Sequence, residues 1–156
     1  MTMKVNPIPE GQASATPYLC VKDATRALAF YAKAFGGREI VRLMQPDGRV
    51  GHAEIMIGAA RIMLADEFPE MDLRGPLTLG GTPVILHLYV EDVDAFVSRA
   101  VGAGAKLLRP VQDQFYGDRS GRLADPFGHH WDVGSRLEDV SPEEMQRRAT
   151  KLYGPG

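Results

Sequence analysis

Two side chains able to transfer protons stand two residues apart in a run of alternating apolar and polar residues. The run Gly51 to Ile57 predicts a β-strand, so His52 and Glu54 should point to the same face. A carboxylate in a partly apolar cavity acquires a raised pKa, and histidine titrates near neutrality. Glu54 with His87, from a second strand-like run, is therefore a candidate catalytic pair for proton transfer. The alternative is a hydrogen-bonded pair that only satisfies two buried polar groups.

The same polar side chains allow a metal site as a further alternative. Two histidines and one carboxylate are the ligands of one common type of non-haem iron centre. His52 and Glu54 would aim in the same direction from one strand, and His87 would approach from a distant strand. A non-standard metal enzyme with these three ligands thus remains open.

Alternation in the other strand-like runs predicts which side chains share this surface. Leu86 and Leu88 form the apolar side of the run 84–90, which leaves His87 and Tyr89 on its other side. The apolar sides should pack on helices, so the opposite sides should line a cavity. We expect these ligand-binding residues on the cavity side or at its mouth: Tyr18, His52, Tyr89, Tyr116, Arg122, His130 and Asp132.

The elements that must position these residues occur twice along the chain. The hexamer Tyr18-Leu19-Cys20-Val21-Lys22-Asp23 begins one copy, and His87-Leu88-Tyr89-Val90-Glu91-Asp92 begins the other. Leu, Val and Asp match at the same offset. Each hexamer is followed by a helix-like run and then by a glycine-rich stop. Such a repeat predicts two similar units that bury faces against each other, with the functional surface between them.

Hydrophobic periodicity predicts a β-α-β-β-β order in each copy. The expected strands are 16–21, 39–44, 51–57, 61–65, 84–90, 106–111, 119–124 and 130–133. Helices should follow the N-cap residues Asp23 and Asp92, and a further helix should begin after Ser141. This further helix has no counterpart in the repeat.

The expected organisation is one α+β domain with two appendages. Residues 1–14 form a flexible arm, 15–135 the domain and 136–156 a C-terminal helical extension. Within the domain, the first module covers 15–66, a long joint 66–81 and the second module 82–134. The length of the joint indicates either a functional segment or a plain connection.

Composition limits the classes of function. The chain has 156 residues, 44% of them hydrophobic and 24% charged, which is ordinary for a globular protein. A net charge of −2 gives no reason to expect nucleic acid as a partner, and no apolar run is long enough to span a membrane. The single cysteine, Cys20, lies in an apolar strand-like run, which predicts an unreactive thiol and no disulfide. A cytoplasmic location follows by default.

The segment Phe115 to Trp131, with Asp125-Pro126-Phe127-Gly128 inside it, resembles the closing segment of the vicinal oxygen chelate superfamily. That superfamily includes glyoxalase I, bleomycin-resistance proteins, fosfomycin-resistance enzymes and extradiol dioxygenases. Its doubled β-α-β-β-β order is similar to the order found here, over about residues 15–135. The motifs Thr16-Pro17-Tyr18, His52-Ala53-Glu54 and Gln114 to Arg119 resemble those of the PhnB-like branch.

The resemblance implies a curved eight-stranded mixed sheet around a cavity, formed by the two βαβββ modules with helices outside. It also implies a homodimer. In the metal enzymes of the superfamily, ligands lie on the first and fourth strands of each module, which correspond here to Thr16, Met63, Ile85 and Asp132. Asp132 is the one credible ligand among them, so we expect the usual divalent metal site to be absent and leave the cofactor unknown.

Two main classes of function remain open. The first is a small-molecule-binding protein of the glyoxalase and bleomycin-resistance type, with an apolar or aromatic ligand and no assigned activity. The second is a lyase-like or isomerase-like enzyme, independent of metal or weakly dependent on it, that uses Glu54 and His87 for proton transfer. Aromatic residues at the cavity mouth favour binding, whereas the polar floor favours catalysis. We favour the binding protein.

Overall fold

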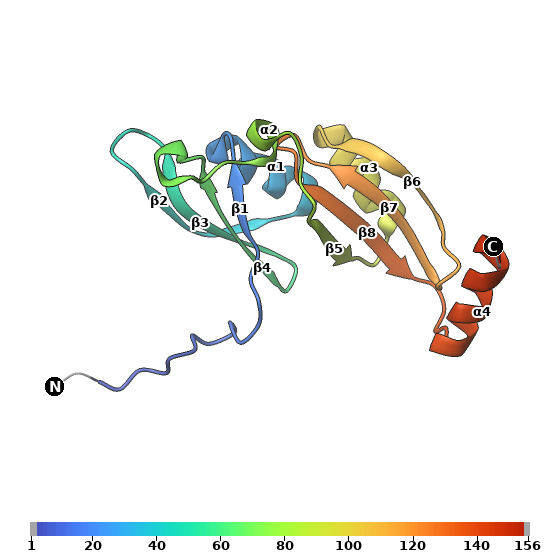
Figure 1. The fold of residues 1–156 in the computed structure, drawn as a ribbon. Coiled ribbons are helices and arrows are strands. Elements are labelled where there is room, and N and C mark those ends of the chain that lie inside the picture. The colour runs from blue at the N-terminus through green and yellow to red at the C-terminus, as the bar shows by residue number, and fades with distance from the viewer. Residues whose placement is uncertain (1–2, 155–156) are drawn as a thin grey trace.

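Each half of the chain folds into a four-stranded mixed sheet with one helix on one face, as the sequence repeat predicts (Figure 1). The computed structural model describes residues 3–154. The first module comprises β1 (Tyr18–Val21), α1 (Ala24–Phe35), β2 (Arg38–Met44), β3 (Val50–Ile57) and β4 (Ala60–Asp66). The second comprises β5 (Ile85–Tyr89), α3 (Val93–Ala103), β6 (Lys106–Asp113), β7 (Asp118–Ala124) and β8 (His130–Arg136).

The two sheets have equivalent strand orders. They are β1-β4-β3-β2 and β5-β8-β7-β6, and in each the first-named strand is parallel to its neighbour while the other pairs are antiparallel. The predicted α+β fold of two βαβββ modules is therefore confirmed, with the eight strands divided between two sheets. The predicted strand positions hold to within about three residues, the scatter expected for element boundaries.

Both module helices begin at the aspartates that close the repeated hexamers. The carboxylate of Asp23 accepts a hydrogen bond from the Arg26 amide at 3.1 Å, and Asp92 accepts one from the Ala95 amide at 3.0 Å. These contacts satisfy amides that have no partner inside the helix. The first helix, α1, ends where Gly36 adopts a left-handed conformation with a φ of 68°.

Strand alternation separates a helix-covered face from an open face in each sheet. Ala53, Ile55 and Ile57 of β3 are buried beneath the helices, whereas His52 and Glu54 lie on the opposite side and are half-buried. We call the side away from α1 and α3 the open face. Because successive side chains of a strand point to opposite faces, the register of the strand decides both which residues face the helices and which lie on the open face.

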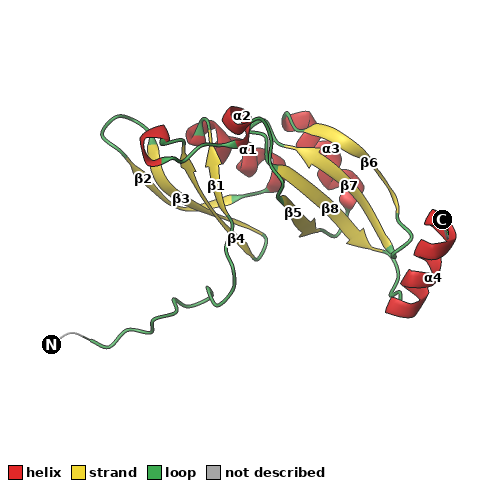
Figure 2. Cartoon of the chain, viewed as in Figure 1, coloured by secondary structure: helices red, strands yellow, loops and turns green. Residues whose placement is uncertain are grey.

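The core is continuous between the two modules. Trp131 of β8 is fully buried, and its ring centroid lies 5.8 Å from that of Tyr31 and 5.0 Å from that of Phe35, both in α1. Trp131 belongs to the second module, but these aromatic neighbours belong to the first. The reason is that α1 and α3 pack side by side behind both sheets (Figure 2), so a residue of β8 reaches α1.

A buried carboxylate at the start of the last hairpin ties the modules together. Asp125 accepts hydrogen bonds from the Tyr31 hydroxyl at 2.6 Å and from the Trp131 indole at 2.9 Å. It also accepts from the amides of Phe127 and His129. His129 in turn lies 2.9 Å from the Cys20 carbonyl oxygen through its Nε2 atom, which again joins the second module to the first.

The joint between the modules contains two short helices, η1 (Pro69–Met71) and α2 (Pro76–Leu79). The Glu67 carboxylate fixes the start of α2, because it accepts from the Gly75 amide at 2.8 Å and from the Thr78 hydroxyl. The N-terminal arm runs away from the sheets, whereas α4 (Pro142–Tyr153) stands at the far end of the second module (Figure 1). Within residues 3–154, no helix is both long and apolar enough to cross a membrane.

Candidate functional site

The open face of the first module carries a chain of polar contacts that centres on Glu54. One carboxylate oxygen lies 2.9 Å from His52 Nε2, and the other accepts from Arg61 at 2.6 Å. His52 Nδ1 lies 2.8 Å from the Tyr18 hydroxyl oxygen. Three strands, β1, β3 and β4, supply these residues, which we call the Glu54 cluster.

The Glu54 cluster keeps its carboxylate ionised. Hydrogen bonds from His52 and Arg61 lower the pKa of Glu54. Partial burial raises the pKa of Tyr18, and the nearby Cys20 and Glu54 add to that rise, so the phenol stays protonated at neutral pH. The raised pKa that the sequence predicts for Glu54 in an apolar cavity is therefore wrong. Its hydrogen bonds favour the charged form, and they outweigh burial.

The open face of the second module carries a second cluster, centred on Asp132 of β8. Arg122 donates two hydrogen bonds to its carboxylate, at 2.6 and 3.1 Å, and Arg109 lies 3.8 Å away. Partial burial opposes ionisation of Asp132, but Arg122, Arg109 and His87 outweigh it and lower the pKa. We call these four residues the Asp132 cluster. It holds two arginines for one carboxylate, so it has an excess of positive charge.

Glu54 and His87 lie in different sheets and are not hydrogen-bonded to each other. Glu54 is bound by His52 and Arg61. His87 has no hydrogen-bond partner among residues 3–154. The His87 ring packs edge-on against Tyr89, with 4.6 Å between the ring centroids. Arg61 and His87 nevertheless line one cavity of about 500 Å3 between the sheets. We call it the inter-sheet cavity; its other lining residues include Met56, Thr16 and Leu86.

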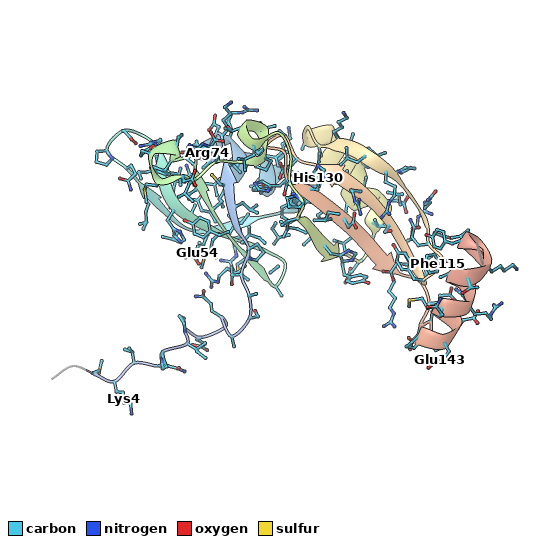
Figure 3. All side chains as sticks on the ribbon, in the orientation of Figure 1. Lys4, Glu54, Arg74, Phe115, His130 and Glu143 are labelled. Carbon is cyan, nitrogen blue, oxygen red and sulfur yellow. The ribbon has the colours of Figure 1, made fainter. Side chains whose placement is uncertain are left out.

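The remaining sequence-predicted site residues lie around these clusters. Tyr89 donates a hydrogen bond from its hydroxyl to Asp118 at 2.7 Å, and the Tyr116 hydroxyl lies 3.2 Å from that of Ser120. His130 starts β8 near the junction of the two modules, whereas Glu54 lies far out on the first module (Figure 3). The structure thus distributes the predicted residues over both open faces instead of gathering them at one point.

Sequence reasoning missed three charged residues of the site: Arg61, Arg109 and Asp118. Arg61 pairs with Met56 across the β3–β4 hairpin, and Arg109 pairs with Arg122 across β6 and β7. Cross-strand partners share a face, so a correct hairpin register around Gly58 would have placed Arg61 beside Glu54. Arg109 lies between two register shifts in β6, which no pattern in the sequence indicates.

The residues present do not fit the metal site of the superfamily's metal enzymes. Of Thr16, Met63, Ile85 and Asp132, only Asp132 offers a charged oxygen ligand, and Arg122 occupies both of its carboxylate oxygens. An iron site formed by His52, Glu54 and His87 does not fit either, because both ring nitrogens of His52 are engaged within the Glu54 cluster. Within the described part of the chain, no three His, Cys, Asp or Glu side chains are grouped closely enough to hold a metal ion.

Cys20 lies on the open face beside the Glu54 cluster but is not activated. Partial burial, with the carboxylates of Glu67 and Asp66 nearby, raises the pKa of its thiol to about 11. A thiol with that pKa carries almost no thiolate at neutral pH. This agrees with the unreactive cysteine that the sequence predicts.

Comparison with known proteins identifies the family to which this geometry belongs. The family model for the glyoxalase/bleomycin resistance protein/dioxygenase superfamily matches residues 12–133. The chain belongs to this superfamily. An uncharacterised protein of Mycobacterium tuberculosis is 44% identical over 148 residues, which cover 93% of this chain and 85% of that protein.

Solved structures of other proteins share the fold. TioX from Micromonospora sp. ML1 is 28% identical with a TM-score of 0.64, and the match covers 80% of this chain and 99% of TioX. The fosfomycin resistance protein FosX of Listeria monocytogenes is 18% identical with a TM-score of 0.63, covering 85% of this chain and 97% of FosX. The superfamily segment ends at residue 133, so α4 lies beyond it.

Proposed function

We propose that this superfamily member binds a small, largely apolar or aromatic molecule between its open faces, at the inter-sheet cavity. The observation that carries the proposal is that each carboxylate of the two clusters is held by an arginine. Glu54 is held by Arg61 and Asp132 by Arg122. Glu54 thereby fixes Arg61 at the wall of the inter-sheet cavity, and a pocket of this size with a few fixed polar groups suits a small ligand.

The geometry supports binding over proton transfer by Glu54. A general base works best when its pKa lies near the working pH, and the pKa of Glu54 is lowered by His52 and Arg61. Glu54 would therefore hold a captured proton weakly. One observation favours an enzyme instead: His87 lines the cavity and has no hydrogen-bond partner among residues 3–154. In such an enzyme His87 would transfer the proton, and Asp132 would lie beside it on the neighbouring strand.

We also propose that the protein is a homodimer in which the open faces contribute to the interface. Tyr18 is 51% exposed, Leu43 57% and Tyr89 64%, and all three lie on open faces. Two copies of such a surface, one from each subunit, can pack against each other across a twofold axis. The sequence motifs that resemble the PhnB-like branch support a place in that branch.

A thermal unfolding screen tests the proposed function even while the ligand is unidentified. A compound that binds only the folded chain raises stability by mass action, about 2.7 kcal/mol at 100 times its Kd. We expect hits among neutral aromatic and heterocyclic compounds, and we expect Arg61→Ala or His87→Ala to reduce the stabilisation. Arg42→Ala is the matched control, because Arg42 also pairs with a glutamate of the first module, Glu39, away from the cavity.

Two results of this screen would contradict the proposal. If no compound class stabilises the protein, or if every hit acts equally on Arg61→Ala, the inter-sheet cavity is not the binding site. If a hit is converted to product and the conversion is lost in His87→Gln, the protein is an enzyme and the alternative replaces a binding function.

A further inference from the structure

A second and larger cavity, of about 840 Å3, lies between α4 and the open face of the second module. We call it the α4 pocket. Its walls are mainly apolar and aromatic, and they include Tyr89, Phe115, Tyr116, Val140 and Met145. The volume falls within the range of pockets that hold drug-sized molecules.

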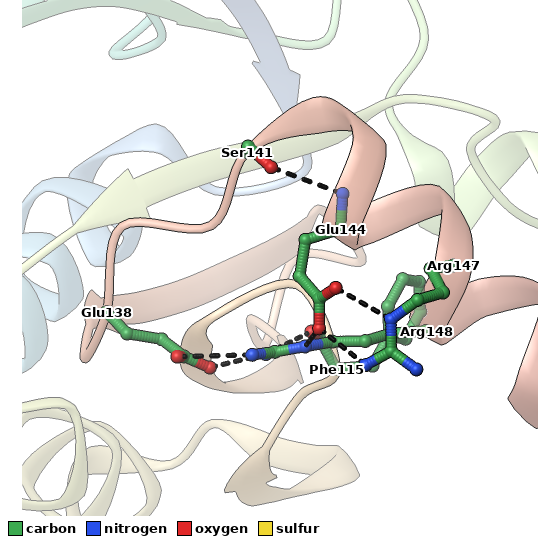
Figure 4. A network of polar contacts seen from close by, with 6 residues as sticks. All are labelled: Phe115, Glu138, Ser141, Glu144, Arg147 and Arg148. Carbon is green, nitrogen blue, oxygen red and sulfur yellow. Dashed lines mark hydrogen bonds and ion pairs between the residues drawn. The ribbon is translucent and has the colours of Figure 1, made fainter.

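The wall formed by α4 is positioned by ionic contacts and by one aromatic contact, in which the Tyr153 ring of α4 meets the Phe115 ring edge to face, with centroids 6.0 Å apart. Arg148 donates a hydrogen bond to the Phe115 carbonyl at 3.1 Å and pairs with both Glu138 and Glu144 (Figure 4). Arg147 also binds Glu144, and the two arginines together lower the pKa of Glu144 to about 2, so the network stays charged. The helix is thereby fixed to the loop that precedes β7.

No residue of α4 is buried, although one side of the helix is apolar. An amphipathic helix normally gains its stability by burying that side. Here Met145 lines the α4 pocket and is only half-buried. The fold therefore keeps an apolar space open that a close-packed helix would fill.

The aromatic walls present ring surfaces, since their hydroxyls are already engaged. Tyr89 donates to Asp118 and Tyr116 lies within hydrogen-bond distance of Ser120. The Phe115 and Tyr116 rings meet edge to face, with centroids 5.2 Å apart. Aromatic faces and a methionine thioether both favour contact with another aromatic ring.

One carboxylate in the wall of the α4 pocket has an oxygen atom that accepts no hydrogen bond from residues 3–154. Asp118 is only 6% exposed and lines the pocket. Its Oδ2 atom accepts from Tyr89, while its Oδ1 atom has no hydrogen-bond donor among residues 3–154. This oxygen can therefore accept a hydrogen bond from a ligand that supplies an O–H or N–H group.

We infer that the α4 pocket holds a planar aromatic molecule that carries a hydroxyl or N–H group, donated to Asp118. This is a second ligand site beyond the proposed function, because the α4 pocket shares no lining residue with the inter-sheet cavity. It also adds a wall outside the superfamily segment, residues 12–133. In this arrangement α4 is a binding element: it supplies Met145 to one side of the ligand, and Val140 contributes from the loop just before it.

The first test compares three probes by calorimetric titration of the full chain. We expect 2-naphthol to bind with a Kd below about 1 mM. 2-Methoxynaphthalene lacks the donor, so it should bind about tenfold more weakly or worse. Decahydro-2-naphthol keeps the hydroxyl without the planar rings and should also bind more weakly. Equal binding of 2-naphthol and 2-methoxynaphthalene would overturn the role of Asp118, and no binding of 2-naphthol would overturn the inference.

The second test locates the ligand through methionine methyl resonances at a constant protein concentration. Met145 lines the α4 pocket and Met56 lines the inter-sheet cavity, so each methyl group reports on one cavity. We expect 2-naphthol to shift the Met145 signal. A shift at Met56 without one at Met145 would overturn this inference and leave the proposed function standing, whereas a library hit that shifts neither would count against both.

Charge substitution provides a matched pair of variants. Met145→Glu places a carboxylate in the apolar wall and should weaken 2-naphthol binding at least tenfold, while its far-ultraviolet circular dichroism stays native. Met71→Glu changes an exposed methionine of the joint, remote from α4, and should leave binding unchanged. Equal affinities of these two variants for 2-naphthol would overturn the assignment of the site to α4.

Discussion

Arg61 binds the carboxylate of Glu54 at 2.6 Å from the neighbouring strand, and this contact decides what Glu54 does. Without it, the carboxylate would have only His52 as a partner. With it, Glu54 is an ionised anchor that holds Arg61 at the edge of the inter-sheet cavity, which His87 also lines. Loss of the contact should therefore affect both the stability of the first module and the shape of the cavity.

Replacing Arg61 by Leu should lower the free energy of unfolding by about 1–2 kcal/mol. The side chains of Arg61 and Glu54 are 25% and 16% exposed, so the substitution leaves a half-buried carboxylate short of a donor. Arg42→Leu removes the more exposed pair with Glu39 and should cost less than about 1 kcal/mol. Urea unfolding of both variants measures the difference. Equal losses would show that Arg61 contributes nothing special to Glu54.

The contribution of Glu54 to stability should depend on pH in a defined direction. Its folded pKa lies below the ordinary value of about 4.3, because His52 and Arg61 bind the charged form. The stabilisation is therefore fully present above that ordinary pKa and is lost as pH falls through the lower, folded pKa. The stability difference between wild type and Glu54→Gln should shrink from pH 6 to pH 3. A difference that grows on acidification would show that the charged carboxylate is not the stabilising form.

The Tyr31 hydroxyl should make a measurable contribution to the contact between modules. It donates to the buried Asp125 at 2.6 Å, so Tyr31→Phe should cost about 1.5–3 kcal/mol, the usual value for a hydrogen bond to a charged group. Asp125→Ala should cost more, because the Trp131 indole then also loses its acceptor. Tyr153→Phe, at an exposed position, is the control. Thermal unfolding that is unchanged in Tyr31→Phe would refute the assigned role.

Cys20 should react slowly with thiol reagents in the folded protein. Its pKa of about 11 reduces the thiolate fraction at pH 8 by roughly 10²-fold relative to a free cysteine. Because it is the one cysteine in the chain, the rate of reaction with a chromogenic disulfide reports on it alone. Introducing an exposed thiol by Leu152→Cys supplies a fast reference, and unfolding in urea should abolish the difference between the two. A folded-state rate equal to that of the reference would contradict the raised pKa.

Association should depend on the open face of the first module. Leu43 is 57% exposed and lies across the β2–β3 pair from His52, so Leu43→Glu should shift the proposed dimer toward monomer at micromolar concentration. Leu79→Glu alters a comparably exposed leucine of α2 and should not. Light scattering after size exclusion distinguishes these outcomes. A wild-type monomer under the same conditions would refute the proposed dimer.

Local sequence patterns predicted the scaffold well because they depend on short-range geometry. The aspartate N-caps and the strand alternation around His52 and Glu54 each follow from a few neighbouring residues, and the structure confirms them. The repeat of these patterns predicted the two modules. Within a strand, alternation also predicts which side chains share a face, since a strand has only two faces.

Side-chain partners were harder to predict because they depend on pairings distant in sequence. Arg61 reaches Glu54 through a hairpin register, and Trp131 meets Tyr31 from the other module. The same limit applies to α4. Its start at Ser141 was predicted from the capping residues, but its position over Phe115 depends on Arg148 and Glu138, which no periodic pattern connects.

The central claim is that a small molecule binds at the inter-sheet cavity, and calorimetric titration of the best stabilising compound tests it most directly. We predict saturable binding to wild type with a negative change in heat capacity, since apolar surface is buried. We also predict that binding is lost when Arg61→Ala and His87→Ala are combined, and kept in Arg42→Ala. Binding that persists unchanged in the combined variant would contradict the claim.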